Sequence, residues 1–348
     1  MATARRAFSD EVPTDCWYAL EPSDHVSRSL RPVRAAGRPV VLYRTEDGRA
    51  VALEDRCAHR AYPLSAGTLV GDSVRCGLCG FVYDAEGQCV SVPTQPRVPF
   101  GAHVASYPVQ ELDGLVWVWL GEQGRARLHR VPELPWLADD GWSTVGGTAE
   151  VDAGFLLLHE NFADVTQVPF VAPEIAPSVL AAQPPPLDVV VTETTVTLRR
   201  EFPPSELPAW QSELLGGESG AHPTTHEGIF VSPAVWVDHW DVGGGVEARL
   251  RFTHLVTPVH EGRSHLHWRV SRDFAVGDAA ADARMLDMFA DYYARVLEAM
   301  TVAQAVLDTD GPGPEVNVAA DVAALKVREI VLAMLAEERP AARTRSTS

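Results

Sequence analysis

Two short loops that carry metal-binding side chains constrain the fold of this chain most strongly. The first loop holds Cys57 and His59, and the second, after a gap of sixteen residues, holds Cys76 and Cys79. Two loops of this kind, each presenting two soft or imidazole donors from a β scaffold, form a four-ligand site of the Cys3His type. Such a site suits either one Zn²⁺ or one [2Fe–2S] cluster. The competing interpretation is a set of unrelated buried cysteines that pack as small apolar groups.

Size and charge set further limits. The chain has 348 residues with 46% hydrophobic content, enough for two domains that each bury a core. Its 29 basic against 47 acidic residues give a net charge of −18 without a basic cluster, so nucleic acid is not an expected partner. No apolar targeting segment precedes residue 15, and no stretch approaches the ~20 apolar residues that span a bilayer. We therefore expect a cytoplasmic protein with no membrane partner.

The pattern of predicted secondary structure changes near residues 121–130. Before that point, short β-rich runs alternate with turn signals, which predicts a small all-β domain over residues 1–125. Beyond it, strands followed by long amphipathic segments predict an α+β domain over residues 126–340, and residues 341–348 are expected to be a disordered tail. The expected strands are 39–44, 50–53, 74–76, 83–87, 115–120, 189–200, 229–240, 246–257 and 264–274, and the expected helices are 153–165, 280–307 and 321–338.

The residues around the two loops resemble the Rieske domain of ring-hydroxylating and O-demethylating oxygenases. The resemblance rests on Asp-Arg-Cys-Ala-His-Arg at 55–60, Cys-Gly-Leu-Cys-Gly-Phe-Val-Tyr-Asp at 76–84, and Gly-Leu-Val-Trp-Val-Trp-Leu-Gly at 114–121. In that family the second loop is Cys-x-x-His, whereas Cys79 stands here at the last position. A Rieske centre needs two imidazoles on one iron, and these ligands raise its potential. A cluster with three thiolates and one imidazole should be harder to reduce.

Residues 155–173 are similar to the iron-binding helix of the same family, whose pattern is Asn-x-x-Asp-x-x-His-x-x-x-x-His. Asn161 and Asp164 match this pattern, but Gln167 and Ala172 occupy the two histidine positions. The family takes its third iron ligand, an acid, from its long C-terminal helix, and the corresponding position is Tyr293. The resemblance therefore implies a cluster or zinc domain but no mononuclear iron, because an alanine cannot bind metal and neither imidazole is present.

The resemblance also implies an architecture. We expect an α+β protein with an N-terminal Rieske-like β domain and a C-terminal helix-grip (START-like) domain, assembled as a head-to-tail homotrimer. The family's bridging acid would be Asp164, with Gln167 and Tyr293 converging on the same pocket. These three residues are the candidate catalytic groups, although Gln167 and Tyr293 could equally fill space and satisfy each other.

Three functions follow as hypotheses. The first is an enzyme that kept the apolar pocket and performs redox-independent chemistry, such as a cyclisation or cycloaddition in natural-product biosynthesis, on a hydrophobic small molecule. The second is an oxygenase with atypical ligands, which would need a reductase or ferredoxin. The third is a non-catalytic subunit of a mixed trimer. Histidines on the expected strands could rebuild an iron site, but such residues are more often surface or satisfied core groups. They include His226, His239 and His254.

Overall fold

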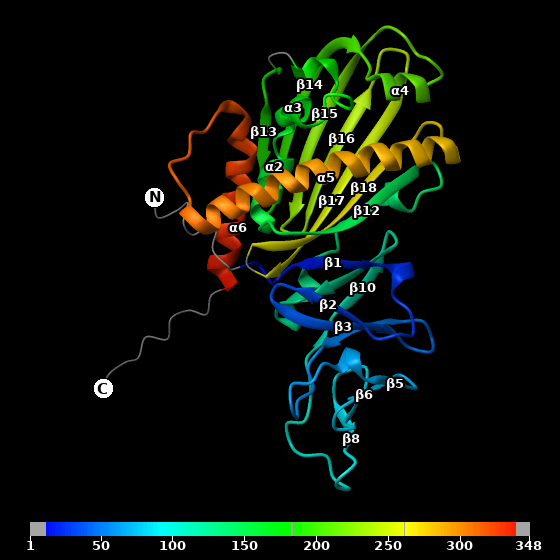
Figure 1. The fold of residues 1–348 in the computed structure, drawn as a ribbon, viewed down its shortest axis with the longest axis vertical. Coiled ribbons are helices and arrows are strands. Elements are labelled where there is room, and N and C mark those ends of the chain that lie inside the picture. Colours follow the sequence, from blue (N-terminus) through cyan, green and yellow to red (C-terminus); the bar gives the residue numbers. More distant parts are fainter. Residues whose placement is uncertain (1–11, 182–183, 261, 339–348) are drawn as a thin grey trace. The chain divides into compact units, whose positions relative to one another are not determined.

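The computed structural model describes residues 12–181, 184–260 and 262–338, and these divide into two compact units. The N-terminal unit contains Thr14–Glu133 together with Thr257–His260, and the C-terminal unit contains the rest of the described chain from Leu134 onward. Strands dominate the first unit, while the second combines one large sheet with helices (Figure 1). The expected α+β class is confirmed. The expected tail at 341–348 lies outside the described residues, and the domain bounds at 125 and 126 remain predictions.

The N-terminal unit consists of three small antiparallel sheets. The hairpin between its second and third strands turns through Ala36 and Gly37, which both have positive φ (47° and 73°), as a tight two-residue turn requires. The sheet orders are β1 (Trp17–Pro22), β11 (Leu115–Trp119), β10 (Val109–Leu112); β2 (Arg31–Ala35), β3 (Arg38–Arg44), β4 (Ala50–Glu54), β9 (Ser106–Tyr107); and β5 (Thr68–Val70), β6 (Ser73–Arg75), β7 (Val82–Tyr83), β8 (Cys89–Ser91). The first predicted ligand loop leads from β4 toward β5, and the second joins the adjacent strands β6 and β7.

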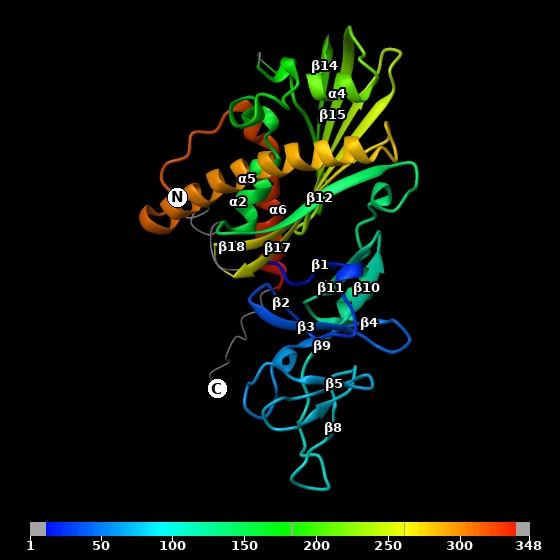
Figure 2. The same ribbon diagram turned by 45° about the vertical axis from the view of Figure 1, so that its right-hand side comes forward.

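The C-terminal unit is built on one seven-stranded sheet. Its strand order is β12-β18-β17-β16-β15-β14-β13, so the last strand in the sequence lies beside the first. The long helix α5 crosses one face of this sheet, as both views show (Figures 1 and 2). The strands are β12 (Ser143–Val151), β13 (Asp188–Val191), β14 (Val196–Glu206), β15 (Ala221–Ser232), β16 (Val235–Val242), β17 (Ala248–His260) and β18 (Arg263–Arg272).

The sequence explains how α5 (Ala279–Asp310) is placed. Its start is fixed by Asp278, whose side chain accepts hydrogen bonds from the backbone N–H groups of Ala280 and Ala281. Its buried face includes Met285, Phe289, Tyr292, Tyr293, Val296 and Leu297, a helical repeat that packs on the sheet. The other helices are α2 (Phe155–Phe162), α3 (Val168–Val171), α4 (Ala209–Leu214) and α6 (Val322–Glu338). None of the helices in the described ranges is long and apolar enough to cross a membrane.

Three expected strands are wrong. Of residues 83–87, only Tyr83 belongs to a strand, and the others form a turn before β8. The other two are each two strands joined by a tight turn. Residues 189–200 form parts of β13 and β14, and the turn is closed by hydrogen bonds between Thr192 and Thr195. Residues 229–240 form parts of β15 and β16, where Ser232 Oγ accepts from the N–H of Ala234. Strand β12 was not expected, and its Gly146-Gly147 pair has a low strand propensity. These glycines let the strand approach Trp268 and Arg269 of β18 closely.

Gly228 in β15 gives a direct test of packing in this sheet. A Cβ at this position would lie 2.7 Å from Trp236 Cζ2, 3.0 Å from Leu198 Cγ and 3.1 Å from Asp238 Oδ1. We expect Gly228→Ala to lower the free energy of unfolding by about 1–3 kcal/mol, because a well-packed core must shift to accept the methyl group. Urea denaturation measures the change. Gly124→Ala is the matched control, since a Cβ there contacts nothing within 4 Å; equal effects would contradict the packing argument.

Candidate metal centre and active site

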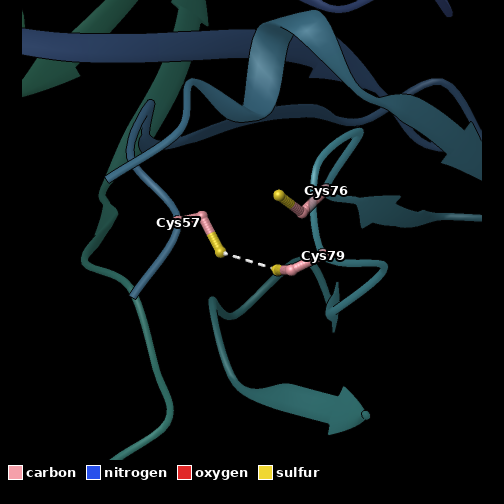
Figure 3. Close-up of side chains that lie close together, drawn as sticks. All are labelled: Cys57, Cys76 and Cys79. Atoms are coloured by element: carbon pink, nitrogen blue, oxygen red, sulfur yellow. Dashed lines mark hydrogen bonds between the residues drawn. The ribbon is translucent and has the colours of Figure 1, made fainter. Parts of the chain in front are cut away.

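Three cysteine thiols converge in the N-terminal unit. Cys57 follows β4, and Cys76 and Cys79 lie on the loop between β6 and β7. Their sulfur atoms all lie within 4.8 Å of one another, and the Cys57 and Cys79 sulfurs are 3.6 Å apart (Figure 3). His59 is not in this group: its ring stacks on Phe81 with the centroids 4.9 Å apart. The structure thus brings three of the four predicted ligands together, while the fourth, on the same loop as Cys57, lies outside the group.

Tyr83 is a residue of this centre that the sequence did not single out. Its hydroxyl lies 3.2 Å from the Cys57 sulfur and accepts a hydrogen bond from the N–H of Ala58 at 3.1 Å. The hydroxyl proton is therefore free to point at the sulfur. Burial alone would raise the pKa of the Cys57 thiol, but the Tyr83 hydroxyl, the His59 amide and the neighbouring thiols together lower this pKa below its ordinary value. The lowered pKa favours the thiolate form of Cys57, which is the form that binds a metal ion.

Cys79 shows the opposite behaviour. Burial, followed by the nearby Cys76 and Cys57, raises the pKa of its thiol to about 12. Thiols that crowd together in this way cannot all ionise unless a cation replaces their protons. The donor set therefore fits a thiolate-binding metal ion or an iron–sulfur cluster. When bound, a [2Fe–2S] cluster would supply one-electron transfer, whereas Zn²⁺ would stabilise the fold without redox chemistry.

A second candidate site is an apolar cavity in the C-terminal unit. It lies between the sheet, α5 and the segment around α2 and α3, and its water-accessible space is about 90 Å³. The three predicted catalytic residues, Asp164, Gln167 and Tyr293, all line it, although ~130 residues of sequence separate the last from the others. The cavity wall is otherwise mainly apolar and aromatic.

The amides of Asn161 and Gln167 form a pair at the cavity wall. Gln167 Nε2 donates to Asn161 Oδ1 at 3.3 Å. The other polar atoms, Asn161 Nδ2 and Gln167 Oε1, are buried and have no partner within the described residues. Buried polar atoms without partners are uncommon in proteins. The pair therefore offers one donor and one acceptor to a bound molecule. Asp164, in contrast, is occupied in capping: its Oδ1 accepts from the N–H and hydroxyl of Thr166.

Tyr293 is tied to residues that the sequence did not place in the site. Its hydroxyl lies 2.8 Å from His254 Nε2, and His254 Nδ1 lies 3.9 Å from Asp238 Oδ2. Asp238 is also held by the indole N–H of Trp236 at 2.9 Å and by His226 Nε2 at 2.8 Å. Because Nδ1 of His254 faces a carboxylate, we assign its proton to Nδ1, which leaves Nε2 to accept from the Tyr293 hydroxyl. The Tyr293 oxygen is then an acceptor toward the cavity.

The cavity does not fit a mononuclear iron ion. Gln167 and Ala172 stand at the positions where the resemblance requires imidazoles, and the Tyr293 hydroxyl already binds the nearest imidazole, that of His254. Among residues 12–181, 184–260 and 262–338, three ligand atoms of His, Cys, Asp or Glu gather only at the three cysteines. The three positions that the resemblance assigns to iron ligands therefore offer no 2-His-1-carboxylate donor set.

Burial keeps three histidines of this unit neutral. It is the main cause that lowers the pKa of His159, of His239 and of His254 to about 4. In an unfolded chain histidine titrates near ~6.5, so between pH 6.5 and 4 the unfolded state binds more protons than the folded state. The free energy of unfolding should therefore fall as the pH falls through this interval, by up to about 1.4 kcal/mol per pH unit for each histidine. Urea denaturation across the interval measures the slope.

His254→Gln separates this effect from the titration of carboxyl groups. The variant keeps all other titratable groups. Its free energy of unfolding should therefore fall less steeply than that of the parent between pH 6.5 and 4, and the difference is the contribution of His254. Parallel curves for the two proteins would show that His254 takes up a proton as easily in the folded as in the unfolded state.

The cluster of Cys57, Cys76 and Cys79 leads to a prediction about metal content. Purified without oxygen, the protein should contain either one Zn²⁺ or one [2Fe–2S] cluster, and Cys76→Ala should lose it together with part of the stability of the N-terminal unit. Elemental analysis and a visible spectrum distinguish the two occupants. Cys89→Ala is the matched control, because Cys89 is a buried free cysteine outside the group. A folded protein that contains neither occupant would refute the assignment.

Comparison with known proteins finds a matching domain family for each of the two units. Residues 16–108 match the Rieske [2Fe-2S] domain, and residues 151–337 match the vanillate O-demethylase oxygenase C-terminal domain. The oxygenase component of dicamba O-demethylase from Stenotrophomonas maltophilia is 28% identical over 327 residues, which cover 91% of this chain and 96% of that protein. The iron-sulfur subunit of the toluene-4-sulfonate monooxygenase system from Comamonas testosteroni is 30% identical over 76% of this chain and 80% of its own length.

Solved structures agree with these matches. The crystal structure of dicamba monooxygenase bound to 3,6-dichlorosalicylic acid superimposes with a TM-score of 0.85 at 26% identity, covering 95% of this chain and 99% of that one. The Rieske match and the converging thiols together indicate an iron–sulfur-binding domain. The chain belongs to the family of Rieske oxygenases that includes the oxygenase components of vanillate O-demethylase and dicamba monooxygenase.

Proposed function

We propose that this chain is an enzyme that performs redox-independent chemistry, of the cyclisation or cycloaddition type, on a hydrophobic small molecule from natural-product biosynthesis. The observation that carries the proposal is the contrast within the C-terminal unit. A cavity is present, but an amide, a methyl group and a phenol (Gln167, Ala172 and Tyr293) stand at the positions where the resemblance implies iron ligands. A family member that kept its pocket and gave up its metal ligands has kept the means to bind and orient a substrate.

The first contribution of the cavity is confinement. Holding two reacting ends of one molecule in a near-attack geometry is worth up to ~7–11 kcal/mol of the activation barrier. Rigid aromatic walls provide such confinement. Tyr293 stacks on Trp268 with centroids 4.5 Å apart, and Phe162 stacks on His254 at 3.9 Å. These contacts link α5 and α2 to the sheet, and they fix the shape into which a flexible substrate must fold.

The second contribution is a fixed set of dipoles. The Asn161 Nδ2 donor can polarise a substrate carbonyl, and the Gln167 Oε1 acceptor can orient a substrate hydroxyl. Tyr293 acts through its oxygen, because its proton is directed at His254. Donors and acceptors that are already in position in a dry cavity need no reorganisation as the reaction proceeds. No electron transfer is required of these groups.

The relatives suggest how the chain assembles and what else it could meet. They are named as components or subunits of oxygenase systems, so a reductase or ferredoxin is a partner only if the cluster domain of this chain is redox-active. We propose a homotrimer, as the family resemblance implies. A role as a non-catalytic subunit would place the same cavity in a mixed trimer with an intact homologue.

Replacing the polar side chains of the cavity should slow the reaction steeply. We expect Gln167→Ala and Tyr293→Phe each to reduce turnover by about 10²–10³-fold, the usual effect of removing one group that acts on the transition state. Apolar metabolites of the host, separated and followed by mass spectrometry, provide the substrates and the readout. Cyclisation leaves the mass of the substrate unchanged, whereas oxygenation adds one oxygen atom.

The controls separate the alternatives. Gln110→Ala, at an exposed position of β10, should have no effect on turnover. Chelators and the removal of oxygen should also leave the rate unchanged. A reaction that stops without oxygen and an electron donor would instead establish an oxygenase with atypical ligands. Turnover that appears only when an intact homologue is added would establish the non-catalytic subunit.

A further inference from the structure

Tyr292 is a tyrosine of the cavity wall that no step of the proposed reaction uses. It lies on α5 one turn after Phe289, and both side chains line the cavity. The Tyr292 ring meets the ring of Tyr293 edge to face, with the centroids 5.0 Å apart. Phe289 packs edge to face on Trp210 and Phe252, at 5.6 and 5.4 Å. Ring contacts therefore hold this wall in place, and they leave the Tyr292 hydroxyl unoccupied.

The Tyr292 hydroxyl has no hydrogen-bond partner among the residues that the structure describes. The hydroxyl of Tyr293 differs, because it is bound to His254 Nε2 at 2.8 Å. Only 9% of Tyr292 is exposed, yet its hydroxyl is not one of the unpaired polar atoms that the described chain encloses completely. The accessible surface that it keeps belongs to the cavity that Tyr292 lines. Buried tyrosine hydroxyls usually find a partner, so this one points to a ligand.

Gln167 determines where the Tyr292 proton can point. The Gln167 amide favours the ionised form of Tyr292, which is the effect of an N–H turned toward the phenol oxygen. The contact does not reach the geometry of a hydrogen bond, and Gln167 Nε2 donates instead to Asn161 Oδ1 at 3.3 Å. A phenol oxygen that faces an N–H turns its own proton elsewhere. The Tyr292 proton is therefore free to point into the cavity.

The Tyr292 hydroxyl also keeps its proton. Burial, followed by the charge of Asp238, raises the pKa of Tyr292 well above its ordinary value, and the Gln167 amide opposes this only in part. A tyrosine whose pKa is raised stays neutral and remains a hydrogen-bond donor. Its surroundings thus make Tyr292 unsuitable as a base and suitable as a donor to an uncharged oxygen.

We propose that Tyr292 donates a hydrogen bond to a carbonyl oxygen of the substrate, which is an uncharged, conjugated carbonyl compound. A donor that is already in position in a dry cavity binds more strongly as negative charge develops on that oxygen, and so it polarises the attached π-system. The inference rests on the proposed function, since it names the donor and the substrate group of the same pocket. The two adjacent tyrosines then differ in role, with Tyr292 as the donor and Tyr293 as an acceptor held by His254.

Acetophenone, a small conjugated ketone, tests the donor without turnover. Its carbonyl band in the infrared moves to lower wavenumber when the oxygen accepts a hydrogen bond, and an isotope label on the carbonyl carbon separates this band from those of the protein. With the parent protein in excess, the band should lie at lower wavenumber than in hexane. Tyr292→Phe removes only the hydroxyl, so the band should return toward the hexane position and the affinity should fall by about 2–10-fold.

Two further variants keep the test decisive. Tyr293→Phe removes one hydroxyl from the adjacent tyrosine, whose proton is directed at His254, and should leave the carbonyl band at the position seen with the parent. Tyr292→Gln replaces the phenol with an amide donor. It should keep part of the shift, and it provides the test if the phenylalanine variant does not fold.

Ethylbenzene, which has the shape of acetophenone without the carbonyl, separates a donor from a residue that only shapes the cavity. Calorimetry should give the same ethylbenzene affinity for the parent and for Tyr292→Phe. An equal loss of affinity for both ligands would overturn the proposal.

The proposal is also overturned if the parent does not bind acetophenone, if the bound carbonyl absorbs where it does in hexane, or if Tyr293→Phe displaces the band as far as Tyr292→Phe does. A band that stays at the parent position in both Tyr292→Phe and Tyr292→Gln has the same meaning. None of these measurements involves turnover. Failure here therefore leaves the redox-independent reaction standing, and an oxygen requirement in turnover would leave Tyr292 standing as the donor.

Discussion

The hydrogen bond between Tyr293 and His254 joins the long helix to the sheet at the centre of the cavity. The two residues come from α5 and β17, and their side-chain atoms meet at 2.8 Å. His254 is fixed in turn by Phe162, which stacks on its ring, and by the Asp238 carboxylate near its other nitrogen. Because these groups are buried and neutral or paired, the helix cannot shift without leaving a polar atom unsatisfied. The shape of the cavity depends on this contact.

That contact also separates the chain from its relatives in chemical terms. In the family that this chain resembles, the residue at the position of Tyr293 is an acid that binds iron. A carboxylate at this position would occupy the space that the Tyr293 phenol fills. The phenol instead binds an imidazole and turns the former ligand position into part of the wall. Meanwhile the cysteine centre remains assembled in the N-terminal unit. The cavity thus carries Gln167 and Tyr293 where the resemblance implies iron ligands, and the N-terminal unit carries a thiol-rich ligand set.

Local sequence patterns predicted the parts of the molecule that depend on local geometry. The loops around Cys57 and Cys76 were predictable because their ligands lie a few residues apart. Gln167 could be placed by its spacing from Asn161 within a short helical segment, and Tyr293 by its position along α5. The helices themselves carry clear apolar periodicity.

The remaining features depend on contacts that no local pattern contains. His226 and Asp238 come together only through the pairing of β15 and β16, and that register was hidden because this hairpin was expected as a single strand. His254 resembled any other histidine on a strand until α5 placed Tyr293 against it. Tyr83 belongs to the thiol centre through a turn that brings it back beneath Cys57. Such sites follow from strand register, which sequence periodicity does not determine.

We propose, as the central claim, that this cavity does not bind mononuclear iron, because Gln167, Ala172 and Tyr293 stand at the positions of the family's iron ligands. Nitric oxide added to the protein in the presence of ferrous ion tests this claim directly, because iron held by imidazole and carboxylate ligands gives a high-spin nitrosyl signal in electron paramagnetic resonance. The variant with Gln167→His, Ala172→His and Tyr293→Asp restores the ligand types and serves as the positive control. The account predicts no such signal from the parent protein. A high-spin nitrosyl signal from the parent that disappears in His254→Gln would contradict it.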